Sequence, residues 1–376
     1  MKVAPERLRR LERLYPQALQ EPCAIDFSGI AQGTAPQGAL DHAGFRYAPV
    51  HNNGVDSMRV WRLFATICAL APSLGALAQP YPAGTVRLVI PFAAGSATDV
   101  YARLVGRHLS DALGQPVVVE ARPGANGSIA AQQVAKSKPD GLTLFFTTNT
   151  THAANPSLMK QMTYDPVKDF DPVTKIGGIA FFMAVNGASP YKSVQDVIDA
   201  AKAQPGRISY GSGNSLGILA PAALQKITGT QMTHVPYKST PQALVDVLGG
   251  QVTFLFVDLS VSRPHTQSGR ARLLAVATLN RSPLAPEIPS MDELGYKGFD
   301  IPGWFGLFAP AGTPRDIIAR VNTEVVKIIA RADLKQTLAT MGIDAFTSTP
   351  EELGDYVKSE IQKWARLVRD AGIQPE

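Results

Sequence analysis

Residues 86–105 read VRLVIPFAAGSATDVYARLV, and this stretch indicates the fold class. Val86 to Ile90 is a short apolar run of the kind that forms a buried strand. A loop of small residues, Pro91 to Asp99, follows it. Thr98 to Leu113 has the spacing of a helix, with Gly114 as its stop signal. The apolar residues predicted to share one side of this helix are Val100, Leu104, Leu109 and Leu113. A strand, a Gly-containing loop and a helix in this order predict the first unit of an α/β fold.

The alternation continues toward the C-terminus. Strands are predicted at 117–119, 142–147, 207–210, 233–235, 252–257 and 273–278. Helices are predicted at 128–137, 193–203, 216–227, 241–248, 314–330, 333–341 and 350–371, and a polar loop at 148–155. This pattern is typical of parallel sheets with crossover helices. About 300 residues are long for one hydrophobic core, so the pattern favours two lobes.

Three segments join a strand to a helix through a Gly-rich loop: 91–99, 122–128 and 210–215. Glycine lets backbone N–H groups face a ligand, and a helix start adds free donors and partial positive charge. Open α/β sheets bind ligands where their strands end. Together the three segments predict a site for a carboxylate or phosphate. The alternative for each is a tight turn that only leads into a helix, and for Asp99 a residue that only complements the helix dipole.

Other chemistries find less support. Gly211-x-Gly213-x-x-x-Gly217 is close to a dinucleotide fingerprint, but the acidic residue required about 20 positions later is missing before Asp246. The histidines after residue 78, His108, His152, His234 and His265, have no second histidine and no cysteine three or four positions later, as a zinc motif would. Gly213-Asn214-Ser215-Leu216-Gly217 has the Gly-x-Ser-x-Gly spacing, but nothing in the sequence indicates the histidine and acidic partners of a catalytic triad. We therefore expect no cofactor, no metal and no enzymatic activity, with a hydrolase using Ser212 or Ser215 as the remote alternative.

Charge and cysteine content point to a globular exported chain. Of 36 Lys and Arg and 31 Asp and Glu, 8 and 6 lie in residues 1–78, which leaves 28 and 25 and a net charge of +3. This balance argues against nucleic-acid binding. Both cysteines, Cys23 and Cys68, precede residue 79, so no disulfide is expected after it.

A secretory signal peptide is predicted at 58–78. Arg59 and Arg62 precede the apolar stretch 63–77, and Ala76-Leu77-Ala78 fits a signal peptidase site. The stretch is too short for a permanent membrane span. The alternative is a buried helix of an N-terminal domain. Residues 1–57 are interpreted as a start codon assigned too far upstream, or else as a disordered leader, and the protein is expected in the periplasm.

These residues resemble a known family, the tripartite tricarboxylate transporter substrate-binding proteins, also called Bug receptors or TctC-like receptors. The matching motifs run in order along the chain after residue 78. They include Pro91-Phe92 with Gly95 and Asp99, Leu113-Gly114-Gln115-Pro116-Val117-Val118-Val119-Glu120, Arg122-Pro123-Gly124-Ala125, Lys138-Pro139-Asp140-Gly141, Tyr164-Asp165-Pro166, Tyr210-Gly211-Ser212, Val235-Pro236-Tyr237-Lys238, Leu248-Gly249-Gly250-Gln251-Val252 and Pro310-Ala311-Gly312-Thr313-Pro314.

The resemblance implies an α/β, two-lobed periplasmic binding protein of type II (Venus-flytrap), with a mostly parallel sheet in each lobe. Lobe 1 would comprise 79–180 and 302–376, and lobe 2 would comprise 181–301. The family holds small carboxylates in loops of both lobes, here Phe92 to Asp99 and Thr147 to Thr151 facing Ser212 to Ser215. The expected ligand-binding residues are Phe92, Ala94, Gly95, Asp99, Thr148, Asn149, Ser212, Gly213, Asn214, Ser215 and Asp258.

The resemblance also implies a function. The chain would be a monomeric receptor that captures a small organic anion, such as a di- or tricarboxylate, an acidic amino acid or an aromatic acid, for the membrane subunits of a tripartite transporter. The alternative is a periplasmic sensor that presents a carboxylate to a membrane kinase. Two departures from the family pattern leave the ligand open: Ala94-Gly95-Ser96 replaces a usual Gly-Gly pair, and the loop after Tyr210 is shorter and lacks the usual histidine.

Overall fold

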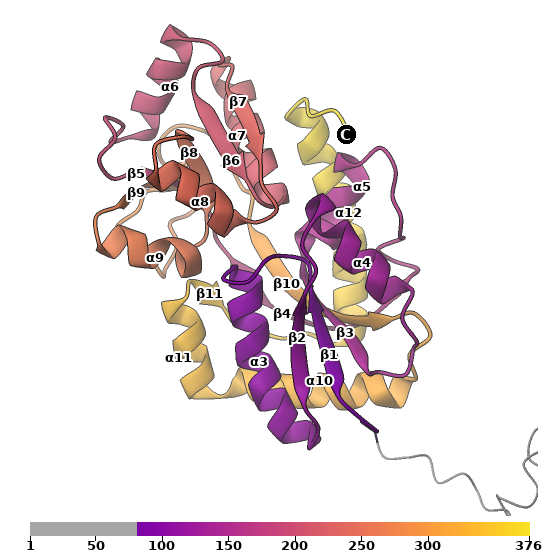
Figure 1. Cartoon of the computed structure of the whole chain (residues 1–376). Coiled ribbons are helices and arrows are strands. Elements are labelled where there is room, and N and C mark those ends of the chain that lie inside the picture. Colours follow the sequence, from indigo (N-terminus) through magenta and orange to yellow (C-terminus); the bar gives the residue numbers. More distant parts are fainter. Residues whose placement is uncertain (1–80) are drawn as a thin grey trace, which may run out of the picture. The chain divides into compact units, whose positions relative to one another are not determined.

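A computed structural model describes residues 81–376, which Figure 1 draws in colour. The predicted leader 1–57 and signal peptide 58–78 lie outside the described residues. Within residues 81–376 the strands form two sheets, one of six strands and one of five. We call each sheet with its packed helices a lobe.

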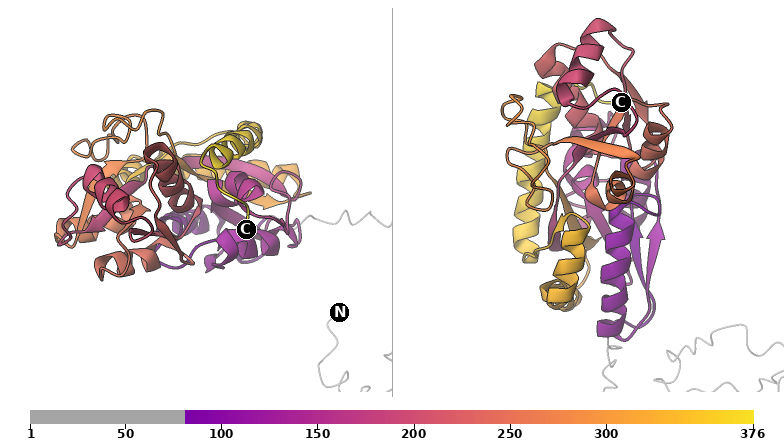
Figure 2. Two further views of the ribbon diagram at one scale, coloured as in Figure 1. Left: turned by 90° about the horizontal axis from the view of Figure 1, so that it is seen from above. Right: turned by 90° about the vertical axis from the view of Figure 1, so that its left-hand side faces the viewer.

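The first lobe contains the six-stranded sheet, in the order β11-β4-β10-β3-β1-β2. Its strands are β1 (Val86–Ile90), β2 (Val117–Ala121), β3 (Thr143–Thr148), β4 (Phe170–Ile179), β10 (Gly303–Pro310) and β11 (Ile343–Asp344). Its helices are α3 (Ala97–Leu113), η2 (Ala125–Gly127), α4 (Ser128–Ala135), η3 (Thr150–Ala154), α5 (Asn155–Leu158), α10 (Arg315–Ala330), α11 (Ala332–Thr340) and α12 (Pro350–Asp370). The second view of Figure 2 shows α3 and α12 at opposite sides of this lobe.

The second lobe contains the five-stranded sheet, in the order β7-β6-β8-β5-β9. Its strands are β5 (Phe182–Asn186), β6 (Ser209–Ser212), β7 (Thr233–Pro236), β8 (Phe254–Val257) and β9 (Ala271–Val276). Its helices are α6 (Val194–Ala203), α7 (Ser215–Thr228), α8 (Thr240–Leu248) and α9 (Leu259–Gln267).

Both sheets are mixed. Parallel pairing joins β2, β1 and β3 in the first sheet and β7, β6 and β8 in the second, and the other strands pair antiparallel. The parallel strands are those whose crossover helices the sequence predicted. The antiparallel strands β4, β5 and β10 lie next to the two points where the chain changes sheets.

Helix α3 illustrates how local signals set the boundaries. The Ser96 side chain accepts a hydrogen bond from the Asp99 amide, and Gly114 ends the helix in the left-handed region with φ 68°. The predicted buried side is wrong at Val100, which is 40% exposed. The helix instead packs through Tyr101, Val105 and Leu109, with small residues between them. Counting aliphatic residues alone missed this face, because small residues allow the closest approach to the sheet.

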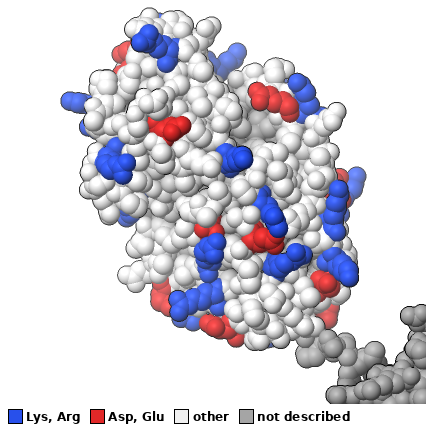
Figure 3. Space-filling view, viewed as in Figure 1, with Lys and Arg blue, Asp and Glu red and all other residues white. Residues whose placement is uncertain are grey.

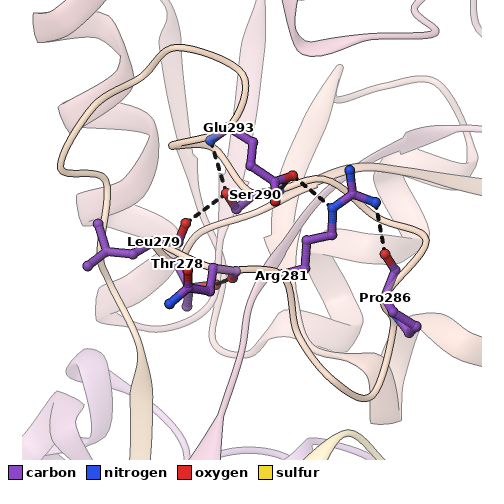
Figure 4. A network of polar contacts seen from close by, with 7 residues as sticks. Thr278, Leu279, Arg281, Pro286, Ser290 and Glu293 are labelled. Atoms are coloured by element: carbon purple, nitrogen blue, oxygen red, sulfur yellow. Dashed lines mark hydrogen bonds and ion pairs between the residues drawn. The ribbon is translucent and has the colours of Figure 1, made fainter.

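The chain returns to the first lobe through residues 277–302, which are braced by the polar network in Figure 4. Arg281 Nε donates to Glu293 Oε2 at 2.8 Å, and its Nη1 donates to the Pro286 carbonyl at 2.9 Å. Ser290 Oγ donates to the Leu279 carbonyl at 2.9 Å and accepts from the Glu293 amide. These bonds hold the long connection in one shape, although it contains no named helix or strand.

Charged residues of both signs are interspersed on the face shown in Figure 3, without a patch of one sign. None of the helices in residues 81–376 combines the length and the apolar character that crossing a membrane requires.

Candidate functional site

A small cavity lies between the two lobes, and we call it the central cavity. It encloses about 30 Å³, room for roughly two water-sized groups. Its lining from the first lobe is Phe92, Ser96, Ala97, Thr98, Thr148, Asn149, Thr150, Ile179 and Phe305. Its lining from the second lobe and the crossing segment is Phe181, Asn214, Leu216, Thr240 and Asp258. The lining thus combines five large apolar side chains with polar ones, an arrangement suited to a small ligand with both kinds of surface.

Four α-helices of the described chain begin at this cavity. Ser96 and Ala97 start α3, Asn214 caps α7, Thr240 starts α8 and Asp258 caps α9. Each helix start carries about half a positive charge and backbone N–H groups that lack partners inside the helix. Because the four ends meet at one cavity, their potentials add there. The cavity therefore favours an anion without needing a cationic side chain.

Capping bonds fix the second-lobe helix ends in place. Asn214 Oδ1 accepts from the Gly217 amide at 3.0 Å, while its Nδ2 donates to Thr240 Oγ1 at 3.0 Å. One side chain therefore ties the start of α7 to the start of α8. The protein therefore sets the relative position of the N–H groups at these two helix starts before any ligand binds, which lowers the entropy cost of binding.

Ser215, the first residue of α7, joins the lobes directly. Its hydroxyl lies 2.9 Å from Thr150 Oγ1 and accepts from Asn149 Nδ2 at 3.1 Å. The Ser215 amide also approaches Thr150 Oγ1 at 3.4 Å. All three residues are buried. The structure thus has the lobes in contact across the cavity, and a ligand larger than a few atoms requires them to move apart.

Asp258 is the one ionisable side chain that lines the central cavity in the described part of the chain. It is 2% exposed, and burial raises the pKa of its carboxyl group. Oδ1 accepts from the Val261 amide at 3.1 Å and from the Ser260 hydroxyl. The residue is therefore both the cap of α9 and part of the cavity wall.

The structure brings together most of the site residues predicted from sequence. Five of them line the central cavity: Phe92, Thr148, Asn149, Asn214 and Asp258. Ser215 lies beside it through its bonds to Asn149 and Thr150. Ala94, Gly95 and Asp99 are not among the lining residues. Their role in ligand binding stays a prediction. For Asp99 the geometry indicates an indirect role, through the loop that precedes α3.

Asp99 holds the first Gly-rich loop in shape. Its Oδ2 accepts from the Gly95 amide at 3.0 Å, and its Oδ1 accepts from Arg103 Nε at 2.9 Å. The carboxylate is buried, whereas the Arg103 side chain is 57% exposed. The bond to Gly95 therefore fixes the loop that leads into the α3 end of the cavity.

Asp99→Ala is expected to lower affinity for the ligand about 10-fold, since the loop loses the bond that orients it, and to cost about 1–2 kcal/mol of stability. Calorimetric titration and urea unfolding measure the two effects. Arg103→Ala is the control, because it removes only an exposed ion pair worth under about 1 kcal/mol. Equal effects of both substitutions would show that the Gly95 bond is unimportant.

A second space, which we call the flanking pocket, lies on the other side of Asn214 and has a volume of about 650 Å³. The predicted residues Ser212 and Gly213 line it, together with Ala125 and Asn126 of the second Gly-rich segment. Ser212 Oγ lies 2.5 Å from His234 Nε2, and burial lowers the pKa of that histidine. Ser212 thus faces this pocket rather than the central cavity.

Sequence reasoning missed several lining residues. Ile179, Phe181, Leu216, Thr240 and Phe305 were not among the named candidates. Thr240 had a usable signal, because it directly precedes the helix predicted at 241–248. The apolar residues had none, since an apolar residue next to a cavity has the same local pattern as one in the core.

A groove of about 1240 Å³ lies on the first lobe beside α10 and α12. None of the predicted site residues lines it. It is bounded by one lobe only, so it does not explain a two-lobed design. Residues 81–376 hold no group of three or more His, Cys, Asp or Glu side chains placed to bind a metal ion.

Two lobes that enclose a small anion-favouring cavity define the class of periplasmic binding proteins, and comparison with solved structures confirms this fold. The family model "Tripartite tricarboxylate transporter family receptor" matches residues 101–373. The chain belongs to this family. Its membership also confirms the expectation of a transport-associated binding protein that is not an enzyme.

The chain matches several relatives of moderate sequence identity over nearly the full length of each relative. Protein BugT of Bordetella pertussis is 34% identical over 325 residues, which span 84% of this chain and 99% of BugT. The solved structure of R. palustris Rpa4515 with adipate is 34% identical, with a TM-score of 0.76, over 79% of this chain and 100% of that chain. MatC from Rhodopseudomonas palustris with bound malate is 30% identical, with a TM-score of 0.72, over 77% and 100%.

Proposed function

We propose that this protein is a periplasmic receptor that captures a small organic acid for the membrane subunits of a tripartite tricarboxylate transporter. In this proposal, residues 58–78 direct its export. The observation that supports acid binding most strongly is the meeting of four helix N-termini at one buried cavity between the lobes. The relatives with bound adipate and bound malate support the same ligand class.

Capture works through the equilibrium between open and closed lobes. The N-terminus of α3 belongs to the first lobe, and the N-termini of α7 and α8 belong to the second. A ligand that bonds to both sides stabilises the closed state more than the open state and so shifts the population toward closure. The Thr150–Ser215 contact is placed to form only when the lobes meet. The closed form would then be the one that docks on the transporter.

A thermal-shift screen tests this proposal. An acid at about 100 times its dissociation constant adds about 2.7 kcal/mol to the stability of the folded state, which corresponds to a rise in Tm of about 5 °C or more. The uncharged amide of the same acid is the matched control, since helix N-termini favour the anion. Equal shifts with acid and amide, or no shift with any carboxylate, would contradict the proposal.

A further inference from the structure

Glu360 is a buried carboxylate whose role the two interlobe spaces do not explain. It lies on α12, is 6% exposed, and lines neither the central cavity nor the flanking pocket. Its Oε2 accepts a hydrogen bond from Trp304 Nε1 at 3.0 Å, and its Oε1 lies 4.0 Å from Lys363 Nζ. A buried indole N–H needs an acceptor, so Glu360 holds the ring of Trp304 in one position.

Trp304 lies where the two crossings of the chain between the lobes meet. It is the second residue of β10, the strand that follows the return to the first lobe. Its backbone pairs with Gly178 in β4, one residue before the Ile179 end of that strand, where the chain leaves for the second lobe. Tyr356 of α12 packs edge-on against the indole, with ring centroids 5.5 Å apart. Helix α12 therefore holds a residue at the base of both crossings.

Trp304 also fixes the orientation of Asn149, which lines the central cavity. The Trp304 amide donates to Asn149 Oδ1 at 3.3 Å, and Asn149 Nδ2 donates to Ser215 Oγ of the second lobe at 3.1 Å. An inverted side-chain amide would place its NH₂ group against the Trp304 N–H, donor against donor. Asn149 therefore presents N–H groups, which a carboxylate can accept, at the contact between the lobes.

We propose that Glu360 is a positioning residue for ligand capture. By holding the Trp304 indole, it sets the position of the Trp304 amide and so the orientation of Asn149 at the lobe contact. Its effect on the ligand is indirect and passes through these two residues. The inference rests on the proposed function and adds α12, on the outer side of the first lobe, to the elements that determine affinity.

Two substitutions of Glu360 separate its oxygen from its charge. Glu360→Met removes the acceptor, keeps a side chain of similar length and remains favourable in a helix. Glu360→Gln keeps a carbonyl oxygen for the indole and removes the charge. Glu324→Met is the matched control. Glu324 is also a buried carboxylate of a first-lobe helix, at 8% exposure on α10, but its ion-pair partners are Arg320 and Lys327 of the same helix.

The first measurement is the affinity for acids. The probes are acetate, succinate, malate, adipate and benzoate, and calorimetric titration gives each dissociation constant. Glu360→Met is expected to weaken the tightest of them about 10-fold, because Asn149 loses its fixed orientation. Glu360→Gln and Glu324→Met are expected to stay within about 3-fold of the wild type, since both keep the acceptor for the indole.

The second measurement needs no ligand. In ¹⁵N-labelled protein, the indole signal of Trp304 is identified by its loss in Trp304→Phe, and the side-chain amide signal of Asn149 by its loss in Asn149→Asp. In Glu360→Met both signals are expected to shift, and the Asn149 amide protons to exchange with water about 10-fold faster. In Glu360→Gln and Glu324→Met the Asn149 signal is expected to stay in place. A purely structural role of Glu360 would lower stability without moving the Asn149 signal.

The outcomes separate this inference from the proposed function. If Glu360→Met keeps its affinity, or if Glu360→Gln or Glu324→Met loses as much, the positioning role is wrong while acid capture stands. An unchanged Asn149 signal in Glu360→Met also contradicts it. If none of the acids binds the wild type, the proposed function fails, and the Asn149 signal alone then supports or overturns the link from Glu360 to Asn149. Circular dichroism of each variant excludes loss of folding as the cause.

Discussion

Gly213→Ala is expected to abolish ligand capture and to destabilise the second lobe. A Cβ at Gly213 would lie 2.1 Å from the Ser239 carbonyl carbon and 2.2 Å from the Thr240 amide nitrogen. Both are backbone atoms, so no side-chain rotation relieves the overlap. Either the start of α7 or the start of α8 must move. The two helix ends hold Asn214 and Thr240, which bond to each other and line the central cavity.

We expect a loss of affinity of about 100-fold or more, because displacement of a positioned donor by about 1 Å has effects of that size. The free energy of unfolding is expected to fall by about 2–3 kcal/mol, as for other substitutions that overpack a buried site. Calorimetric titration and urea unfolding measure the two quantities separately.

Two other glycines serve as controls for Gly213→Ala. Gly354→Ala lies in α12, where the added Cβ is 3.5 Å from its nearest neighbour, so it is expected to stabilise the helix slightly. Gly187→Ala overlaps the Gly269 carbonyl oxygen at 1.9 Å but lies outside both site cavities. Gly187→Ala is expected to lower the free energy of unfolding, while the molecules that remain folded bind the ligand with unchanged affinity. Normal affinity in Gly213→Ala would contradict the role of this contact.

The second large effect concerns acid stability and His152. This side chain is fully buried in the first lobe, where it stacks on Phe308 with ring centroids 3.8 Å apart. Phe145 and Phe170 also pack against it. Its Nδ1 lies 2.9 Å from Thr151 Oγ1, and its Nε2 has no hydrogen-bond partner among residues 81–376. Burial lowers the pKa of His152 from 6.5 to about 3.

The pH dependence follows from that lowered pKa. Between pH 6.5 and about 3 the unfolded chain binds a proton at His152 and the folded chain does not, so stability falls as the pH falls. Above pH 6.5 both states are neutral at this residue and its contribution is constant. At 1.36 kcal/mol per unit, the loss reaches about 3 kcal/mol at pH 4.5 and about 5 kcal/mol at pH 3.

His152→Leu is expected to remove most of this acid sensitivity, even if the loss of the ring contacts lowers stability at pH 7. Urea unfolding at pH 7 and pH 4.5 gives the difference between the two conditions for each protein. His108→Leu is the control, because His108 is partly exposed on α3 and is not buried among rings. A difference in His152→Leu as large as that of the wild type would show that other groups cause the acid sensitivity.

The local parts of this fold were predictable from sequence. The boundaries of α3 and α7 follow from Ser96, Gly114, Asn214 and Gly229, which act on backbone groups within a few residues. The predicted loop at 148–155 was wrong in detail, since residues 150–158 form η3 and α5. Strands β4, β5 and β10 were not predicted. In β10 every residue is buried, so the alternation that identifies a half-exposed strand is missing.

The site, too, was predictable from sequence only in part. The three Gly-rich segments were recognisable, and the first and third indeed reach the central cavity through Phe92 and Asn214. The second instead lines the flanking pocket through Asn126. Nothing in the sequence distinguishes these two destinations, because each segment has the same local design of strand, loop and helix.

The sequence by itself therefore determined the α/β class, the helix ends that could bind an anion and the family. Only the tertiary structure decided which of those ends meet, that Asp99 braces a loop while Asp258 lines the cavity, and that Ser215 bonds to Thr150, 65 residues earlier in the chain. The physical reason is the separation in sequence between the residues that interact. Capping and turn formation depend on neighbours within a few residues, whereas the cavity forms only after the chain has crossed between two sheets and returned.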